Sequence, residues 1–267
     1  MQSSLYLFCF ARSRALPALV GYGVEGDEPL LQQHFRDIAA VYCEVPLDVF
    51  TGPSAEQRLQ DPAWVGPRAV RHGEVIQNVM QHSPVFPARF GTLFSSPRSL
   101  QRLLDKNCGK IGRFLDHVTD KEEWSVKCTL SRAHARERLV SEKLSKRSGE
   151  PSSFPTGLRY LKERQLYGEA DKELSRRLKV VCHAVASELA VHSTSSLSRD
   201  IVRLSETGGK EVVANWAFLV HRGTIARFQT RIEQANMDHN HDGLFFQISG
   251  PWPPYSFSPP LTTGKAT

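Results

Sequence analysis

The chain has 267 residues, of which 40% are hydrophobic and 23% are charged. This length and apolar content provide for a buried core in one large or two ordinary domains, and they exclude an intrinsically disordered chain. The 34 basic and 28 acidic residues give a formal net charge of +6. Residues 131–179 contain 13 basic and 7 acidic residues and carry the whole excess, because the two signs balance on either side.

The cysteines and the apolar runs indicate a cytoplasmic protein. Five cysteines at irregular spacings are typical of reduced thiols packed as small hydrophobic residues; they are Cys9, Cys43, Cys108, Cys128 and Cys182. Arg12 and Arg14 interrupt the N-terminal apolar run, which has no basic region before it, so we expect no signal peptide. The apolar stretch 180–191 includes polar residues and is too short to span a bilayer. We therefore expect a soluble protein.

Strands and helices alternate in the first part of the chain. Residues 5–11 are continuously apolar, as in a central strand that is covered on both faces. Residues 31–46 predict two more strands. Asp61-Pro62 provide an N-cap and a first-turn proline for a helix, which Gly66-Pro67 are expected to interrupt and restart.

A further helix is expected from Ser96-Pro97 to about Thr119, with an apolar stripe at helical spacing. The stripe consists of Leu100, Leu104, Ile111, Leu115 and Val118. Elements of this size in this order predict a small α+β sandwich. We assign residues 1–119 to a degenerate ferredoxin-like (split β-α-β) domain, in which a loop containing Pro17 and three glycines replaces the first helix.

The second half predicts another α+β domain, built around a long helix. Apolar and polar residues alternate from Glu123 to Leu130, as in a strand. After a break at 148–153, a long helix is expected over about 156–192. Its apolar stripe consists of Leu174, Leu178, Val181, Val185 and Leu189.

Two strands, a helix and a last strand complete this half. They are expected at 197–206, 212–221, 223–237 and 243–249, with a turn at Gly208-Gly209 between the first two. Strand, long helix, strand, strand, helix, strand is the split β-α-β order of ferredoxin-like domains. The predicted fold class is therefore α+β with two ferredoxin-like domains, the second covering 120–267 and ending in a tail rich in proline and aromatic residues.

Two segments combine proline, glycine and closely spaced aromatic residues. They are 83–94, which reads S-P-V-F-P-A-R-F-G-T-L-F, and 250–257, which reads G-P-W-P-P-Y-S-F. Such segments have fixed shapes and large apolar area, so they predict contact surfaces with no catalytic role. We expect the protein-binding residues to be Phe86, Arg89, Phe90, Phe94, Trp252, Tyr255 and Phe257.

The second segment has another interpretation, and the first contains an arginine that needs a partner if it is buried. The sequence Pro251-Trp252-Pro253-Pro254 could be a polyproline ligand for an aromatic groove. Burial of its three neighbouring aromatic rings favours a tail that folds back onto its own domain. Arg89 would be costly to bury alone, so we expect it to meet a carboxylate or backbone carbonyls.

The same two segments resemble the gas vesicle protein F/L family, in the patterns P-V-F-P-x-R-F-G-T-x-F and G-P-W-P-P-Y-S-F. Similar stretches lie in order along nearly the whole chain, and the ordered set is far more specific than any one of them. These stretches are 5–8, 23–26, 38–46, 71–76, 122–127, 157–161 and 215–220.

The resemblance implies ferredoxin-like domains and a role in gas vesicle assembly. It leads us to expect an assembly factor and minor structural component that binds the hydrophobic main shell protein and limits its aggregation during nucleation. The cytoplasm and the gas vesicle are the expected locations. Other gas vesicle assembly proteins are candidate partners, and no membrane partner is expected.

The basic segment 131–179 leaves an alternative open, because clustered Lys and Arg are typical of nucleic-acid-binding surfaces. Acidic residues are interleaved with the basic ones, and aromatic residues that could stack on bases are few. This pattern favours the solvated face of a long helix, with contact to a partner as a second use. A nucleic-acid-binding module is therefore the alternative function.

Three short motifs resemble ligand sites without the required context. Residues 21–26 read G-x-G-x-x-G but lack the strand and helix that flank a phosphate-binding loop. His72-Gly73-Glu74 has the spacing of a zinc deaminase but no P-C-x-x-C partner. Residues 238–242, D-H-N-H-D, are adjacent on a predicted turn and do not converge on one ion. We expect no enzyme activity, no cofactor and no metal.

Overall fold

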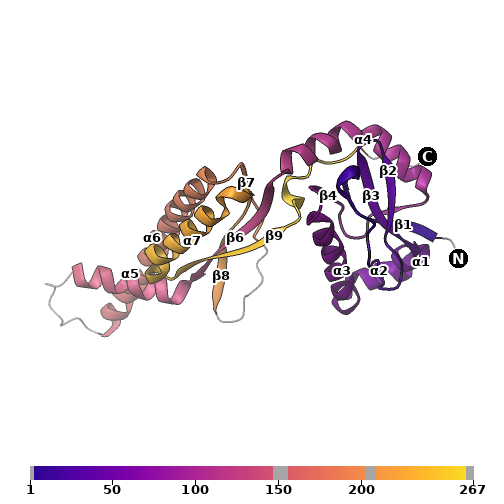
Figure 1. The fold of residues 1–267 in the computed structure, drawn as a ribbon. Coiled ribbons are helices and arrows are strands. Elements are labelled where there is room, and N and C mark those ends of the chain that lie inside the picture. The colour runs from indigo at the N-terminus through magenta and orange to yellow at the C-terminus, as the bar shows by residue number, and fades with distance from the viewer. Residues whose placement is uncertain (1–2, 147–155, 202–208, 263–267) are drawn as a thin grey trace. The chain divides into compact units, whose positions relative to one another are not determined.

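The computed structural model describes residues 3–146, 156–201 and 209–262, with residues 146 and 156–163 described by their backbone alone. Within these ranges the protein is α+β, with two antiparallel sheets and seven α-helices (Figure 1). The chain divides into two compact units, one formed by 1–123 with 251–267 and the other by 124–250.

The first unit is built on a five-stranded sheet of order β2-β3-β1-β4. Its strands are β1 (Ser3–Arg12), β2 (Leu31–Phe35), β3 (Ile38–Pro46), β4 (Val85–Pro87) and β5 (Leu93–Phe94). β3 pairs with one edge of β1, and both β4 and β5 pair with the other edge. The strands predicted at 5–11 and within 31–46 are confirmed.

β1 is buried on both faces, and a β-bulge changes the alternation of its side chains. The register with β3 shifts between Leu7 and Cys9. Tyr6 and Phe8 before the shift, and Cys9 after it, belong to the same core cluster. Phe10 points to the other face, where its ring contacts that of Phe86. An extra residue in one strand has this effect, since side chains otherwise alternate with period two.

Four helices complete the first unit: α1 (Leu47–Phe50), α2 (Pro53–Gln60), α3 (Pro62–Met80) and α4 (Pro97–Val118). α3 and α4 lie on opposite faces of the sheet (Figure 1). Ser96 caps α4 through a reciprocal pair of hydrogen bonds with Ser99, and the predicted apolar stripe of this helix is buried. α1 and α2 were not expected from the sequence.

The interruption expected at Gly66-Pro67 is wrong, because α3 continues through Pro67. Pro67 lies in the second turn, where the lost N–H removes only the hydrogen bond to the Ala63 carbonyl. The start of the helix is held by the Asp61 carboxylate, which accepts a hydrogen bond from the Ala63 N–H at 2.9 Å. The buried stripe from His72 to Val79 then anchors the remaining turns.

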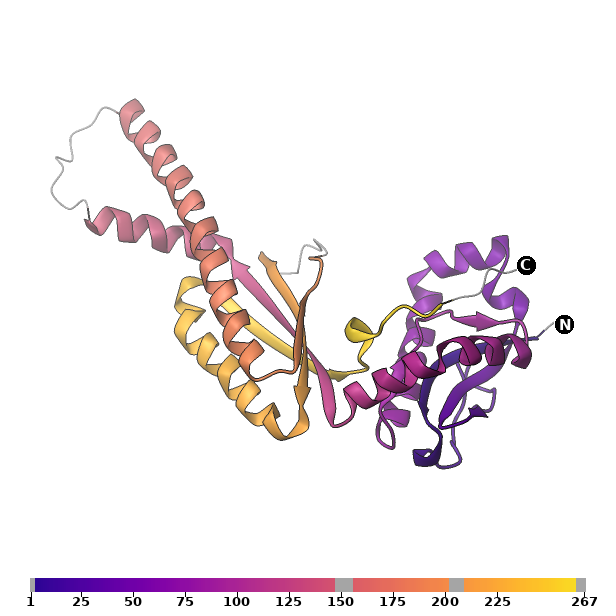
Figure 2. The ribbon, with the colours of Figure 1, turned by 90° about the horizontal axis from the view of Figure 1, so that it is seen from above.

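The second unit is a four-stranded sheet of order β7-β8-β6-β9 with three helices on one face (Figure 2). In chain order its elements are β6 (Lys121–Ser131), α5 (Arg132–Lys146), α6 (Thr156–Val191), β7 (Ser195–Ser198), β8 (Lys210–His221), α7 (Ile225–His239) and β9 (Leu244–Trp252). The alternating residues of β6 and the stripe of α6 pack into one core, so the strand and the long helix predicted here are confirmed.

Some predictions for this unit differ from the structure. α5 was not predicted, although Ala135, Leu139 and Val140 contribute to the core. The strand expected at 197–206 begins earlier and ends at Ser198. The break at 148–153, residues 202–206 of that strand and Gly208 of the expected turn lie outside the described residues.

Both sheets have the same strand order, since each places its third strand between its first and second and its fourth strand beside its first. The C-terminal tail belongs to a different unit from the one expected from the sequence, which placed it in a second domain over 120–267. Residues 251–267 group with the first unit, because the Ser256 N–H and hydroxyl donate to the Glu123 carboxylate at 3.0 and 2.9 Å.

Candidate functional site

The segment 84–94 is largely part of the first sheet. Besides β4 and β5, the Ala88 N–H donates to the Phe8 carbonyl at 2.8 Å and the Leu7 N–H donates to the Thr92 carbonyl at 2.9 Å. The segment therefore follows one edge of β1 from end to end. Phe86 is 5% exposed, and its ring packs at 4.9 Å between centroids against Phe114 of α4. It belongs to the core and offers little surface to a partner.

A buried histidine holds this segment in place. His72 is 3% exposed, and its Nδ1 lies 3.0 Å from the Tyr6 hydroxyl. Its Nε2 lies 3.1 Å from the Ala88 carbonyl and 3.1 Å from the Tyr255 hydroxyl. A carbonyl can only accept, so Nε2 carries the proton and Nδ1 accepts from Tyr6. Burial lowers the pKa of His72 to about 4, and the ring is neutral.

The remaining residues predicted to bind protein have different exposures. Phe90 and Phe94 are half-buried, Phe90 against the His72 ring at 5.8 Å. Trp252 and Tyr255 are 43% and 38% exposed, and Phe257 is half-buried. Arg89 is exposed, and among the described residues no carboxylate or carbonyl contacts its guanidinium. The expectation that Arg89 is paired is wrong, because its side chain points to solvent from a turn and needs no partner.

The tail packs onto the first unit at several points. Besides the bonds to Glu123, the Thr262 N–H donates to the Asn107 side-chain oxygen at 2.9 Å, and Asn107 Nδ2 donates to the Thr262 carbonyl at 3.1 Å. Lys110 Nζ donates to the Pro260 carbonyl at 3.0 Å. The packed tail supports the folded-back interpretation over the polyproline ligand, although the partner domain is the first unit.

The three short motifs form no ligand site in the described residues. In the glycine-rich loop, the N–H groups of Glu25 and Gly26 donate to the Glu28 carboxylate at 3.2 Å each, so an internal carboxylate already occupies these donors. Glu74 is exposed whereas His72 is buried. Within the ranges that the structure covers, no three His, Cys, Asp or Glu side chains are placed to hold a metal ion.

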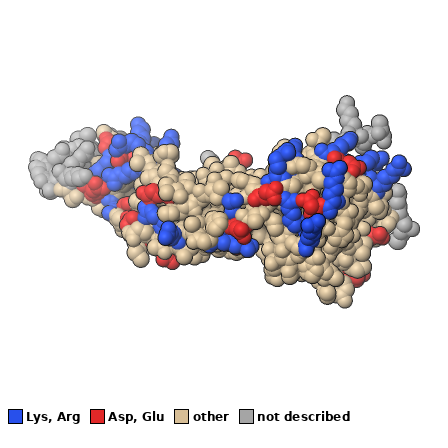
Figure 3. Space-filling view, turned by 45° about the horizontal axis from the view of Figure 1, so that its top comes forward, with Lys and Arg blue, Asp and Glu red and all other residues tan. Residues whose placement is uncertain are grey.

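Most basic side chains that the structure describes in 131–179 are paired with carboxylates. Arg136 forms a bidentate ion pair with Asp171, with both N–O distances 2.9 Å. The other pairs are Arg132 with Glu211, Arg138 with Asp242, Lys143 with Glu169, Arg176 with Glu173, and Arg177 with Glu173 and Glu142. Both signs of charge are accordingly intermixed over α5 and α6 (Figure 3).

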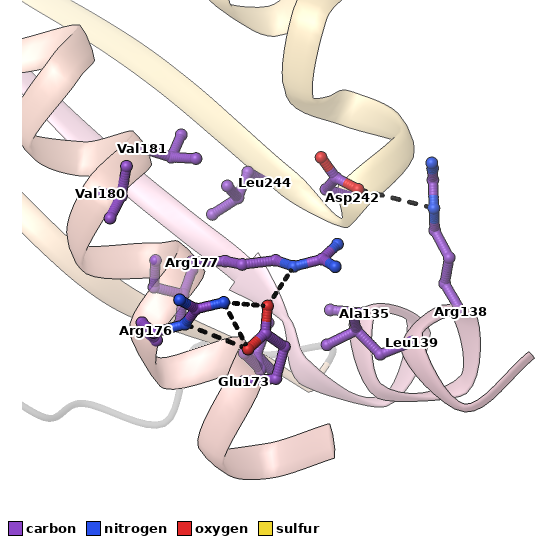
Figure 4. A pocket seen from close by; sticks show the side chains of 12 residues that line it. Ala135, Arg138, Leu139, Glu173, Arg176, Arg177, Val180, Val181, Asp242 and Leu244 are labelled. Carbon is purple, nitrogen blue, oxygen red and sulfur yellow. Dashed lines mark hydrogen bonds and ion pairs between the residues drawn. The ribbon is translucent and has the colours of Figure 1, made fainter. Parts of the chain in front are cut away.

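The second unit contains a pocket of about 430 Å³ between α5, α6 and the start of β9. Its floor is apolar and largely buried, formed by Ala135, Leu139, Leu174, Leu178, Val181 and Leu244. Val180 also lines the pocket and is 65% exposed at its mouth. Charged side chains stand around this apolar surface: Arg138, Glu173, Arg176, Arg177 and Asp242 (Figure 4).

The charged residues around the pocket neutralise one another. The Glu173 carboxylate accepts hydrogen bonds from Arg176 and Arg177 at distances of 2.9–3.1 Å, which lower the pKa of Glu173 to about 2. On the opposite side Arg138 Nε lies 3.5 Å from the Asp242 carboxylate (Figure 4). The pocket therefore presents an apolar floor inside a ring of paired charges.

Such a pocket suits the apolar side chains of another polypeptide, as in the binding of an amphipathic helix to a groove. It contains no pair of nucleophile and base in the described residues. Sequence reasoning missed this pocket. The repeat of Ala135 and Leu139 was a sufficient signal for α5, but the approach of Leu244 depends on the tertiary fold.

The chain is similar to known proteins both in sequence family and in fold. A family model described as gas vesicle synthesis protein GvpL/GvpF matches residues 4–259. The crystal structure of gas vesicle protein GvpF from Anabaena sp. PCC7120 is similar with a TM-score of 0.70 and 16% identity, covering 97% of this chain and 100% of that chain. GvpF from Microcystis aeruginosa gives 0.67 and 14%, covering 96% and 99%. At these identities the likeness shows the fold, which is GvpF-like.

The sequences of curated proteins gave no match to this chain. No helix in the described ranges is both long enough and apolar enough to cross a membrane.

Proposed function

The chain belongs to the GvpL/GvpF family of gas vesicle synthesis proteins, and we propose that it is an assembly factor that binds the hydrophobic main shell protein. In this role it limits aggregation of the shell subunit during nucleation and remains as a minor structural component of the vesicle. It acts by binding alone, without catalysis or a cofactor. Cytoplasm and gas vesicle are its proposed locations, and other gas vesicle proteins are proposed partners.

The observation that carries this proposal is the apolar pocket of the second unit. An exposed valine, Val180, stands at the mouth of a floor made of leucine, valine and alanine. Burial of apolar surface is worth about 25 cal/mol per Å², so a hydrophobic segment gains by leaving water for this floor. Because Glu173 and Asp242 already pair with the neighbouring arginines, the ligand does not need a charge of its own.

The first unit provides a second proposed contact. Phe90, Phe94, Trp252, Tyr255 and Phe257 are at least partly accessible, and Arg89, next to Phe90 in the sequence, is exposed. We also propose the ferredoxin-like class for both units, the first being degenerate. The support is the shared strand order, in which a third strand separates the two strands of each split β-α-β unit.

The nucleic-acid alternative has less support. Phosphate binding needs cations that are available to neutralise it, and its affinity falls steeply with salt. Most described cations of 131–179 pair with carboxylates of the same unit, as Arg136 does with Asp171. Retention of DNA or RNA at low ionic strength through this segment would restore the alternative.

A solubility assay tests the proposal. The purified protein is mixed with the shell subunit as it is diluted from denaturant, and the soluble fraction is measured after centrifugation. We expect the protein to raise the soluble fraction and Val180→Asp to lose most of this effect, because a carboxylate at the pocket mouth opposes insertion of an apolar side chain. No rise with the unaltered protein would reject the proposal.

Val191→Asp is the matched control. Val191 is also on α6 and is 79% exposed, but it does not line the pocket. Both variants place the same charge on the same helix at exposed positions, so their net charge is equal. Equal loss in the two variants would show that the pocket is not the binding site.

A further inference from the structure

α4 carries a row of cations on its outer face. The row consists of Arg98, Arg102, Lys106, Lys110 and Arg113, of which all but the half-buried Lys110 are exposed. The first four follow one another at intervals of four residues, so they lie along one side of the helix. Figure 3 looks onto this helix and shows Lys and Arg side chains gathered over it, with Asp and Glu side chains beside them.

These cations differ from those of 131–179 in lacking carboxylate partners. Among the described residues, no carboxylate lies within ion-pair distance of Arg98, Arg102, Lys106 or Arg113. The two acidic residues of the helix are engaged elsewhere or lie beside the row: Asp116 pairs with Arg12, and Asp105 accepts a long hydrogen bond from Gln101 at 3.5 Å. Within the described part of the first unit, the row is therefore a positive surface that no ion pair neutralises.

We propose that this face of α4 binds an acidic helix of a partner protein. Four residues of a helix rise about 6 Å, so the row from 98 to 113 extends over about 22 Å. A second helix with Asp or Glu at every fourth position has the same repeat and places one carboxylate opposite each cation. Each contact is an exposed ion pair of small value, but several of them in a row add up and also set the register.

The helix is held rigid for this purpose by its inner face. Leu100, Leu104, Ile111 and Leu115 are fully buried, so α4 cannot rotate to present another side. The backbone positions of the row are consequently fixed before the partner arrives, which lowers the entropy lost on binding.

Two observations favour a polypeptide over other anionic partners. Asp105 and Asp116 flank the row and would repel phosphates, whereas an acidic helix can match them with its own Lys or Arg. Described exposed residues of α4 include no Phe, Tyr or Trp on which bases could stack. A membrane surface is disfavoured because basic helices bind it by inserting their apolar face, and the apolar face of α4 is buried in its own core.

The test uses two synthetic peptides of equal composition and the full-length protein. One peptide carries Glu at every fourth position, and the other carries the same residues with the Glu positions spread around the helix. Fluorescence anisotropy at low salt is expected to show at least tenfold tighter binding of the first peptide. The double variant R102E/K106E should abolish this preference, and the neutral variant R102Q/K106Q should weaken binding by several fold.

Arg227→Glu is the control, because Arg227 is an exposed cation on α7 of the other unit. It should bind the peptide as the unaltered protein does. Circular dichroism confirms that the variants are folded, which exposed substitutions should not disturb. Equal affinity for both peptides overturns the proposal, and so does tighter binding of single-stranded DNA or of phosphatidylglycerol vesicles. Val180→Asp should leave peptide binding unchanged, which separates this surface from the pocket.

Discussion

His72 and Tyr255 are 183 residues apart in the sequence, and the His72 Nε2 atom lies 3.1 Å from the Tyr255 hydroxyl oxygen. The same ring accepts from the Tyr6 hydroxyl, which in turn accepts from the Gly91 N–H at 3.2 Å. One buried imidazole thus connects the first strand, the 84–94 segment and the C-terminal tail. The network requires the neutral ring, because its Nδ1 must keep a lone pair for Tyr6.

This requirement predicts loss of stability in weak acid. Burial lowers the pKa of His72 from 6.5 to about 4 in the folded protein. The stabilisation is complete above pH 6.5, where His72 is neutral in both the folded and the unfolded protein. Between pH 6.5 and 4 the unfolded state takes up the proton first, and the free energy of unfolding falls by about 3 kcal/mol from this residue alone. Urea unfolding at several pH values measures the fall.

His72→Gln removes the titrating group and should flatten this part of the pH profile. His82→Gln serves as a control because His82 is exposed after the end of α3, and it should leave the profile unchanged. Should His72→Gln fail to fold, the ring can be titrated directly by NMR in the unaltered protein. A measured pKa near 6.5 would refute the prediction.

Removal of the Ser256 hydroxyl should loosen the attachment of the C-terminal tail. The Glu123 carboxylate is 1% exposed and accepts from both the N–H and the hydroxyl of Ser256. Ser256→Ala deletes one hydrogen bond to a charged group, which costs about 1.5–3 kcal/mol. We expect faster amide hydrogen exchange in residues 252–258 and a lower melting temperature.

Ser258→Ala is the comparison for the tail, since the Ser258 hydroxyl donates only to the nearby Pro254 carbonyl at 2.9 Å in the described structure. This variant should lose less stability, and exchange in residues 252–258 should stay slower than in Ser256→Ala. Identical exchange in both variants would mean that Glu123 does not anchor the tail.

Two glycines should respond in opposite ways to replacement by alanine. A Cβ atom at Gly23 would lie 2.5 Å from Cys43 Sγ and 2.6 Å from Cys43 Cβ, both in the buried core. Gly23→Ala should therefore lower the free energy of unfolding by about 1–3 kcal/mol. Gly73, inside α3, has no atom within 4 Å of the added position, and Gly73→Ala should raise it by about 0.5–1 kcal/mol through helix propensity.

Chemical denaturation of both variants gives the two values. Cys43→Gly removes both clashing atoms. In that background, Gly23→Ala should therefore lower the free energy of unfolding by less than it does in the unaltered protein. An unchanged or higher stability of Gly23→Ala would show that the loop moves away from Cys43 without cost.

The five thiols should divide into two reactivity classes. Cys108 and Cys182 are half-buried, whereas Cys9, Cys43 and Cys128 are buried. Burial raises the pKa of the Cys43 thiol to about 12 and also raises that of Cys9. A hydrogen bond between Cys128 and Cys182 lowers the pKa of Cys182 and raises that of Cys128. Because the thiolate is the reactive form, Cys182 should react first.

Iodoacetamide labelling followed by peptide mass spectrometry measures the order. We expect modification of Cys182 and then Cys108 in the native protein, and of the three buried thiols only in denaturant. Rapid native labelling of Cys9 or Cys43 would contradict the burial of the first core.

Features encoded by near neighbours were predictable from the sequence. The apolar run 5–11 gave a strand buried on both faces, the stripe from Leu100 to Val118 gave α4, and the alternation from Trp124 to Leu130 gave β6. The first is a continuous apolar run, and the other two depend on a repeat of about four or of two residues, so the sequence displays all three directly. The pocket was not predictable in this way, since only the tertiary fold brings Leu244 together with Leu139 and Leu174.

The sequence by itself determined the amount of charge and the alternation of the elements, because both follow from residue type and order. Only the tertiary structure decided which cations are neutralised. Arg136 meets Asp171 at a separation of 35 residues and Arg132 meets Glu211 at 79, so most described cations of the basic segment are compensated. α4 lies in a part of the chain with balanced composition, yet among the described residues no carboxylate pairs with its exposed cations.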